Sequence, residues 1–148
     1  MRTVETSSTA TTPRRWNETV EGIRWLPRLI DKARMSQRGT LGAYLFGHSP
    51  IDIGLLRRLG VTTKQFADIV AASPDDATVL DALRRHGFDE GRVERWSRRL
   101  PARHPWIISA IDRDERYVAR GAWAPVFIAF SATEGFWMGL ARLISRAP

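Results

Sequence analysis

Signals that begin or end a helix recur at short intervals along this chain, whereas the alternating pattern of a strand is nearly absent. Ser49 or Asp52 can cap a short helix that Gly60 ends, because these side chains accept a backbone hydrogen bond and glycine tolerates a left-handed turn. Thr62 and Gln65 have the spacing of a capping box, which predicts another helix start. The connections between these segments are only a few residues long. Neighbouring helices are therefore expected to pack as hairpins or corners.

Three more helix starts follow. Ser73 is expected to be an N-cap, with a proline in the first turn and then Asp75 and Asp76 at the positive end of the helix dipole. This placement explains the two carboxylates more simply than a metal site or an acid–base pair. Asp89 and the segment 104–106 begin the other two helices. The predicted fold class is mainly α, a compact bundle of about six short helices with at most a minor strand or hairpin.

Length and composition indicate a single domain. The chain has 148 residues, of which 43% are hydrophobic, and this suffices for one buried core. Residues 1–19 are rich in Ser and Thr and show no hydrophobic period, which predicts a disordered tail before a helical domain over residues 20–148. The tail has no apolar run typical of a secretory signal, so a cytoplasmic protein is expected. The absence of cysteine excludes disulfides, thiol nucleophiles and cysteine-ligated metals.

The C-terminal part of the chain changes in composition. The charged run 112–121 predicts a turn and one short strand, and the apolar segment 121–146 follows it. Pro125, Glu134 and Arg142 interrupt that segment, and a carboxylate near its middle would be costly in lipid. A buried terminal helix is therefore favoured over a membrane contact. A surface that docks a partner stays open as a third interpretation.

The chain is arginine-rich, with a formal net charge of +7. A basic protein can bind nucleic acid by neutralising phosphates. Here the acidic residues are interspersed with the basic ones, so much of the charge can pair locally. The cluster of Arg95, Arg98 and Arg99 is interpreted as a solvated helix face. Nucleic-acid binding is expected to be weak and unspecific.

The segment WLPRLIDKAR at 25–34 gathers the most unusual residues. Its apolar side chains recur at helical spacing and form one stripe: Leu26, Leu29, Ile30 and Ala33. Its charged side chains point elsewhere and must be either solvated or used: Arg28, Asp31, Lys32 and Arg34. Asp31 stands three residues from both Arg28 and Arg34, so it can hold a guanidinium in place.

Three further segments accompany this helix in a recognisable order. LPRLIDKAR at 26–34 is followed by GTLGAY at 39–44 and by ASPDD at 72–76, with Asp52 and Gly60 between them. These motifs resemble a bacterial family of domains of unknown function. The resemblance covers roughly residues 20–120 and implies that the motifs belong to one structural unit. It implies no reaction.

The favoured function is a small helical binding or interaction module. Arg28, Lys32 and Arg34 with Tyr44 could bind a small anionic metabolite, since they combine cationic groups with a hydroxyl on an aromatic ring. A protein partner is the other partner class. The competing interpretation is architectural: Asp31 fixes the helix against the loop at 39–44, and Tyr44 only packs.

A metal-independent enzyme acting on a small polar metabolite is the alternative. Asp31, Tyr44 and His48 are the candidate catalytic residues, because each can take part in proton transfer. No metal-ligand spacing, phosphate-binding glycine loop or serine elbow occurs, so no metal or cofactor is expected. The other histidines, His86 and His104, suit a helix end and a turn. Convergence of the three candidates in a concave pocket would favour the enzyme.

Overall fold

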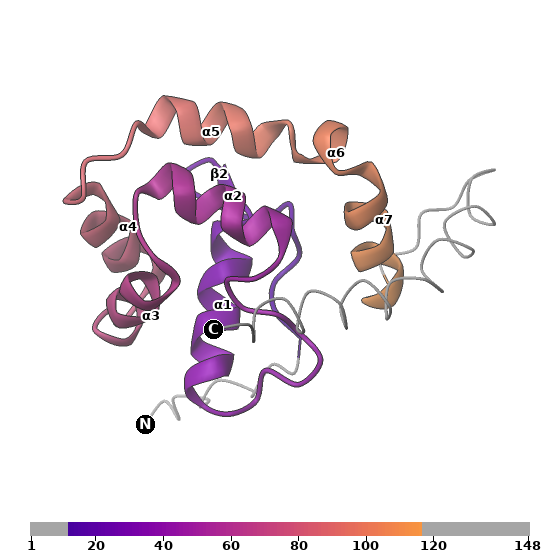
Figure 1. The fold of residues 1–148 in the computed structure, drawn as a ribbon, viewed down its shortest axis with the longest axis horizontal. Coiled ribbons are helices and arrows are strands. Elements are labelled where there is room, and N and C mark those ends of the chain that lie inside the picture. Colours follow the sequence, from indigo (N-terminus) through magenta and orange to yellow (C-terminus); the bar gives the residue numbers. More distant parts are fainter. Residues whose placement is uncertain (1–11, 117–148) are drawn as a thin grey trace, which may run out of the picture.

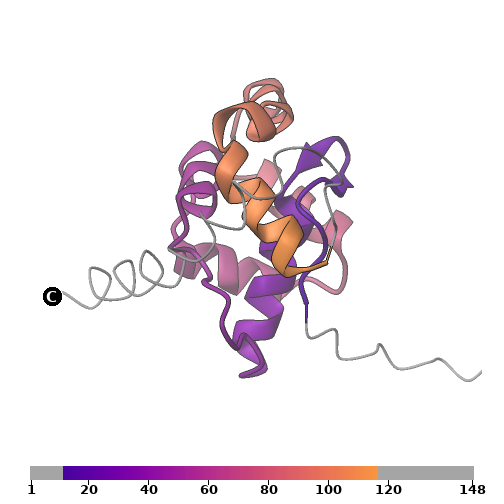
Figure 2. The same cartoon turned by 90° about the vertical axis from the view of Figure 1, so that its right-hand side faces the viewer.

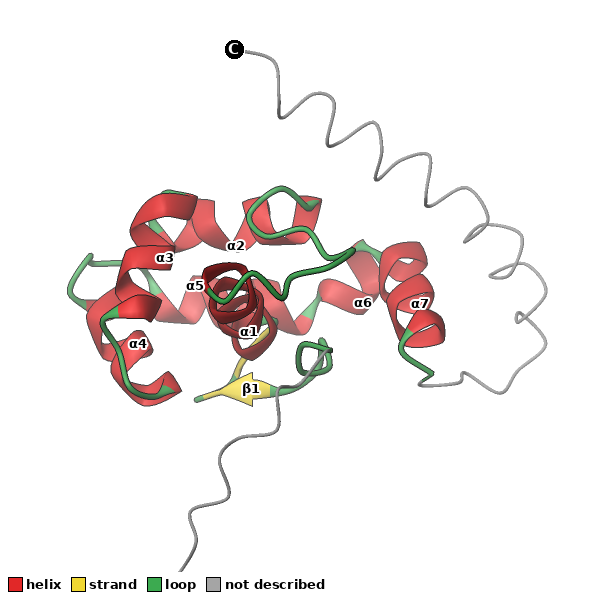
Figure 3. Ribbon diagram, turned by 90° about the horizontal axis from the view of Figure 1, so that it is seen from below, coloured by secondary structure: helices red, strands yellow, loops and turns green. Residues whose placement is uncertain are grey.

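Helix α1 (Leu26–Gln37) lies in the middle of the fold, and the other elements surround it (Figures 1 and 3). The computed structural model describes residues 12–116. Around α1 lie six further helices and one hairpin: β1 (Thr19–Val20), β2 (Ile23–Arg24), α2 (Pro50–Leu59), α3 (Thr63–Ala71), α4 (Asp76–Arg84), α5 (Glu90–Arg98), α6 (Leu100–Arg103) and α7 (Pro105–Asp114). The predicted mainly α fold is confirmed. The residues of the expected tail up to 11, and the apolar segment 121–146, lie outside the described residues.

The apolar stripe of α1 forms the centre of the core, as the sequence predicts. Leu26, Leu29, Ile30 and Ala33 have no exposed surface. The surrounding helices contribute side chains that are also fully buried: Leu55, Phe66, Leu80, Leu83, Val93 and Leu100. Burying these groups supplies the main favourable free energy of folding. Figure 2 shows α7 lying across one side of this core.

Most of the predicted caps are confirmed. Ser49 caps α2, Thr62 and Gln65 form both bonds of the capping box on α3, and Asp89 caps α5. The prediction for α4 is wrong by two residues, because its N-cap is Asp75 and not Ser73. The Asp75 carboxylate accepts two hydrogen bonds from Thr78, whereas the Ser73 hydroxyl donates back to the preceding helix. A charged acceptor forms the stronger cap.

A small hairpin precedes α1. Strands β1 and β2 pair antiparallel, with Val20 opposite Ile23, and the turn between them has positive φ angles at Glu21 (46°) and Gly22 (86°). Such angles suit the two-residue turns of hairpins. The Ser97 hydroxyl of α5 accepts a hydrogen bond from the backbone N–H of Arg24, at 3.1 Å. This bond fixes the hairpin and the entry into α1 against α5.

Helix α7 runs further than the sequence suggests. It includes residues 112–114, so the charged turn expected to begin at residue 112 is wrong over this stretch. Asp112, in this stretch, accepts hydrogen bonds from Arg15 and Trp16, as described below. The remainder of the expected turn and strand, from residue 117 onward, lies outside the described residues. Within residues 12–116, no helix is long and apolar enough to cross a membrane.

Candidate functional site

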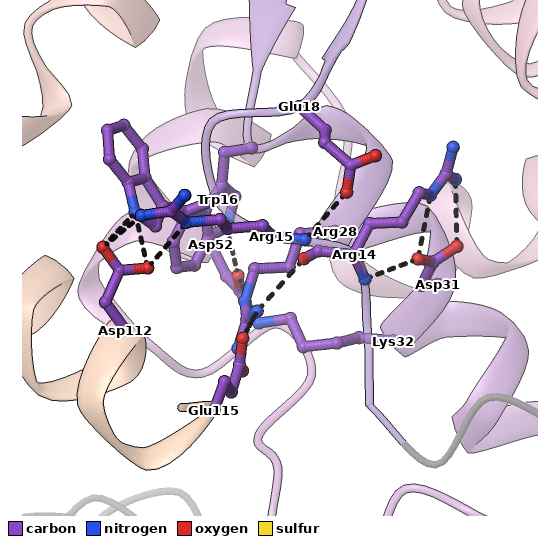
Figure 4. A network of polar contacts seen from close by, with 11 residues as sticks. Arg14, Arg15, Trp16, Glu18, Arg28, Asp31, Lys32, Asp52, Asp112 and Glu115 are labelled. Atoms are coloured by element: carbon purple, nitrogen blue, oxygen red, sulfur yellow. Dashed lines mark hydrogen bonds and ion pairs between the residues drawn. The ribbon is translucent and has the colours of Figure 1, made fainter. Parts of the chain in front are cut away.

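The charged residues of α1 all form ion pairs, and one of these pairs joins Lys32 to Asp52 (Figure 4). The Lys32 ammonium lies 2.7 Å and 2.6 Å from the two carboxylate oxygens of Asp52. The side chains are 4% and 0% exposed, so this pair is shielded from water. Burial lowers the pKa of Lys32, and the Asp52 carboxylate opposes that shift. Of the two possibilities that the sequence leaves open for the charged side chains of α1, the structure shows that Lys32 is not solvated but buried in an ion pair.

Asp52 also organises the chain around it. Its oxygens accept hydrogen bonds from the indole N–H of Trp25 at 2.8 Å and from the backbone N–H of Gly47 at 2.9 Å. Gly47 has a φ of 77°, and a Cβ there would lie 2.4 Å from the Thr63 side chain, so glycine is required. Asp52 thus joins the start of α1, the loop before α2 and Lys32 at one buried point.

Arg28 forms the second buried pair of α1. Its guanidinium donates to both oxygens of Glu115, at 3.0 Å and 2.5 Å, and to the carbonyl of Arg14 at 3.1 Å. The Arg28 and Glu115 side chains are only 3% and 4% exposed. The guanidinium also lies 5.3 Å from the ring centre of Trp25 and 5.6 Å from that of Tyr44. A bidentate carboxylate and two aromatic rings hold this cation in one orientation.

The hydroxyl of Tyr44 belongs to the same neighbourhood. The pKa of Tyr44 is raised, mainly because of burial and then because of the negative charge of Glu115. A raised pKa keeps the phenol protonated at neutral pH, so it is a hydrogen-bond donor and a poor base. Arg28 and Tyr44, two of the predicted ligand-binding residues, are therefore brought together.

Asp31 and Arg34 take part in a second cluster, which is joined to Arg28 through Arg14. Arg14 donates to both oxygens of Asp31, at 2.9 Å each, and to Asp76 at 2.5 Å. Arg34 reaches the other oxygen of Asp76 at 3.2 Å. The expectation that Asp31 holds Arg28 or Arg34 is wrong, because its partner comes from the segment before the hairpin. Asp76 does more than complement the dipole of α4, since it also joins two arginines.

This cluster makes a prediction about acid stability. Burial alone would raise the pKa of Asp76, but its bonds to Arg14 and the charges of Arg14 and Arg34 outweigh it, so the pKa lies below its usual value of 3.8. A lowered pKa contributes stability above the unfolded-state value, and this contribution disappears as pH falls through the folded-state value. Asp76→Asn should therefore be less stable than the parent protein at pH 7. The difference should shrink below about pH 4 in urea titrations followed by circular dichroism. A difference that is the same at both pH values would contradict the role of the charge.

Sequence reasoning missed the partners supplied by the segment before the hairpin and by α7. Arg15 and Trp16 donate to Asp112 at 3.0 Å, so this segment is bonded to α7. Arg14 lies in a stretch assigned to the tail, and Glu115 in one assigned to a turn. The local sequence around these residues has no signal for the pairs, because the partners are 17 to 97 residues apart.

The three candidate catalytic residues are not connected. Asp31 is engaged by Arg14, Tyr44 lies beside Arg28 and Glu115, and His48 is exposed before the start of α2. Within residues 12–116, no hydrogen bond joins any two of them. The same residues contain no group of three or more His, Asp or Glu side chains that could hold a metal ion. No observation on the described part of the chain favours the interpretation that these three residues form the active site of an enzyme.

Comparison with known proteins adds a family but no activity. No curated protein and no solved structure matches the chain. A family described as a domain of unknown function, DUF5069, matches residues 10–122. That range contains every residue of the ion pairs described above. Because it covers most of the chain, the protein belongs to the DUF5069 family.

Proposed function

We propose that this domain is a binding module that takes a small anionic ligand at Arg28 and Tyr44. The observation that carries the proposal is the surroundings of the Arg28 guanidinium, which lies within 5.6 Å of the centres of two aromatic rings and donates to both oxygens of a carboxylate. Arginine in this arrangement recognises planar anions, because its parallel N–H groups match the two oxygens of a carboxylate. In the free protein, the carboxylate is that of Glu115.

One donor of this guanidinium is unused. The Nε atom of Arg28 is buried and has no hydrogen-bond acceptor among the described residues. A buried donor without an acceptor costs free energy, so the site has capacity for one more acceptor atom. A ligand whose carboxylate replaces Glu115, and which bears a second oxygen, would satisfy this donor.

The other predicted ligand residues have supporting roles in this proposal. Lys32 is neutralised by Asp52, and its ammonium lies 5.3 Å from the Trp25 ring centre, so it helps to fix the ring that lies against Arg28. Arg34 belongs to the cluster of Asp76. The ligand would therefore contact Arg28 and Tyr44 directly, while the remaining charges keep the two aromatic rings in place.

The test is a thermal-shift experiment on Glu115→Ala, which removes the carboxylate that pairs with the Arg28 guanidinium. This variant should unfold at a lower temperature than the parent protein, because a buried cation loses its partner. Sodium acetate should then raise the melting temperature more than sodium chloride at equal ionic strength. A site saturated at 100 times the dissociation constant gains about 2.7 kcal/mol, or roughly 5–10 °C for a domain of this size.

The control is the double variant Arg28→Met/Glu115→Ala, which also lacks the guanidinium that would bind the carboxylate of acetate. Acetate should stabilise the double variant no more than chloride does. An equal response of the two variants to acetate would disprove the proposal that Arg28 binds the carboxylate of a ligand. In the parent protein, a panel of hydroxy acids and dicarboxylates should contain compounds that raise the melting temperature, and the response should fall in Tyr44→Phe. If no compound of the panel raised the melting temperature, binding of a protein partner would remain as the hypothesis for the function of this domain.

A further inference from the structure

Four arginines of the described chain lie close together without a carboxylate partner. They come from three helices: Arg57 and Arg58 from α2, Arg92 from α5 and Arg103 from α6. We call them the arginine cluster. None of them forms an ion pair within residues 12–116, and all except Arg58 are exposed. Helix α5, which carries Arg92, packs against both α2 and α6. In agreement with this packing, the pKa of Arg58 is lowered by burial and then by the positive charges of Arg103, Arg92 and Arg57.

Packing between α2 and α5 fixes the centre of the arginine cluster. Gly54 allows a close approach, because a Cβ at this position would lie 2.9 Å from the Trp96 ring. The Arg58 guanidinium then lies 4.7 Å from the ring centre of Trp96 and donates to the carbonyl of Gly54 at 2.9 Å. Neither contact neutralises its charge. Arg58 is thus an oriented cation that retains donors for another partner.

The carboxylates nearest in sequence are already engaged elsewhere. Glu90 of α5 binds Arg84, and Glu94 binds Arg98 on the same helix. Asp89 caps α5 by accepting the backbone N–H of Arg92. The positive charge of the arginine cluster is therefore not compensated by the acidic residues that flank it along α5.

Arg92 has no evident role in the stability of the fold. It lies in the first turn of α5, where the helix dipole favours a negative charge. It also adds to the repulsion around Arg58. By contrast, Arg57 and Arg58 lie in the last turn of α2, where cations suit the dipole. An unfavourable charge at such a position is characteristic of a surface that serves binding.

An exposed apolar side chain adjoins the same surface. Ile53 is 44% exposed and lies one helical turn before Arg57 on α2. We propose that the arginine cluster and Ile53 form a docking surface for an acidic segment of a partner protein, in which carboxylates pair with the arginines and an apolar residue covers Ile53. Arginines beside an apolar contact are characteristic of protein interfaces.

A nucleic acid fits this surface less well. A phosphate backbone that followed α5 would meet the carboxylates of Asp89, Glu90 and Glu94 as well as the arginines. It would also leave Ile53 without an apolar partner. A peptide can place its carboxylates at separate points and avoid this repulsion.

Fluorescence anisotropy with a labelled peptide tests the proposal. The probe is a twelve-residue peptide of repeating Leu-Glu-Glu, measured at 150 mM salt against the full chain. Arg92→Glu/Arg103→Glu should weaken its binding at least tenfold. The matched control, Arg38→Glu/Arg85→Glu, makes the same change of charge at exposed arginines outside the arginine cluster and should change the affinity less than twofold.

Stability is the second readout. Arg92→Glu should melt no lower than the parent protein, so that a loss of binding does not reflect unfolding. Equal losses of affinity in the two double variants would overturn the proposal, since they would indicate a response to net charge. A duplex or single-stranded oligonucleotide that binds more tightly than the peptide, and is lost in Arg92→Glu/Arg103→Glu, would assign the surface to nucleic acid. Failure of the peptide to bind the parent protein would also overturn it, independently of the acetate experiment at Arg28.

Discussion

Lys32→Ala is expected to lower the free energy of unfolding by about 3–5 kcal/mol, because it leaves the Asp52 carboxylate buried without a countercharge. The remaining donors to Asp52 are neutral N–H groups of Trp25 and Gly47, which do not replace the ammonium. Guanidinium titration followed by far-UV circular dichroism would measure the loss. The matched control is Lys64→Ala at the other lysine of the chain. Lys64 pairs with Asp68 on the surface of α3 and should show no measurable change.

A double-mutant cycle separates the pair from its surroundings. Lys32→Met and Asp52→Asn should each be strongly destabilising. The double variant should be more stable than the sum of the single losses allows, by about 0.5–3 kcal/mol, because neither side chain then leaves an isolated charge. Additive losses would mean that Lys32 and Asp52 contribute independently. A loss below about 1 kcal/mol for Lys32→Ala would contradict its burial.

Trp25→Ala is the second change expected to have a large effect. Trp25 is 1% exposed, and its ring faces both Arg28 and Lys32 at 5.3 Å. Removing a buried tryptophan side chain costs about 3–5 kcal/mol. The variant also removes the indole donor to Asp52 and one aromatic face of the Arg28 site. Chemical denaturation should show the loss.

Trp25→Phe divides this effect into its parts. Phenylalanine retains most of the buried ring but not the N–H that donates to Asp52. The expected loss is about 1–3 kcal/mol, the range for a buried acceptor that loses a donor. If Trp25→Phe were as unstable as Trp25→Ala, the hydrogen bond rather than the ring volume would dominate. Wild-type stability of Trp25→Phe would mean that the remaining donors satisfy Asp52.

The features that follow from neighbouring residues could be predicted from the sequence. The capping box of Thr62 and Gln65 and the cap at Asp89 depend on residues three positions apart, so each signal is complete within one helical turn. The wrong N-cap of α4 also reflects the local sequence, because two suitable N-cap residues lie there two positions apart. Ser73 and Asp75 are both good N-cap residues, and only the pairing of Asp75 with Thr78 distinguishes them.

The partners of the charged groups could not be predicted in this way. The sequence identifies α1 as unusual, but Lys32 pairs with a residue 20 positions away and Arg28 with one 87 positions away. Helical spacing says which side chains share a face, and it cannot say which charges a second helix brings to that face. As a result, Arg28 and Lys32 are assigned to a patch of charge in the sequence but are buried in the fold. The placement of Tyr44 beside Arg28 also depends on the course of the loop before α2.

The pairing of Arg15 with Asp112 and of Arg28 with Glu115 has a consequence for the order in which the protein folds. A chain grows from its N-terminus, so the cations emerge long before their carboxylates, 97 and 87 residues later. Until residue 115 has been synthesised, α1 must keep the Arg28 guanidinium hydrated or bury it alone at a high cost. The helices between can assemble around the apolar stripe in the meantime, but the segment before the hairpin cannot bond to α7. Closure of the domain therefore waits for almost all of its described length to leave the ribosome, and a nascent chain that ends earlier carries an unmatched positive charge.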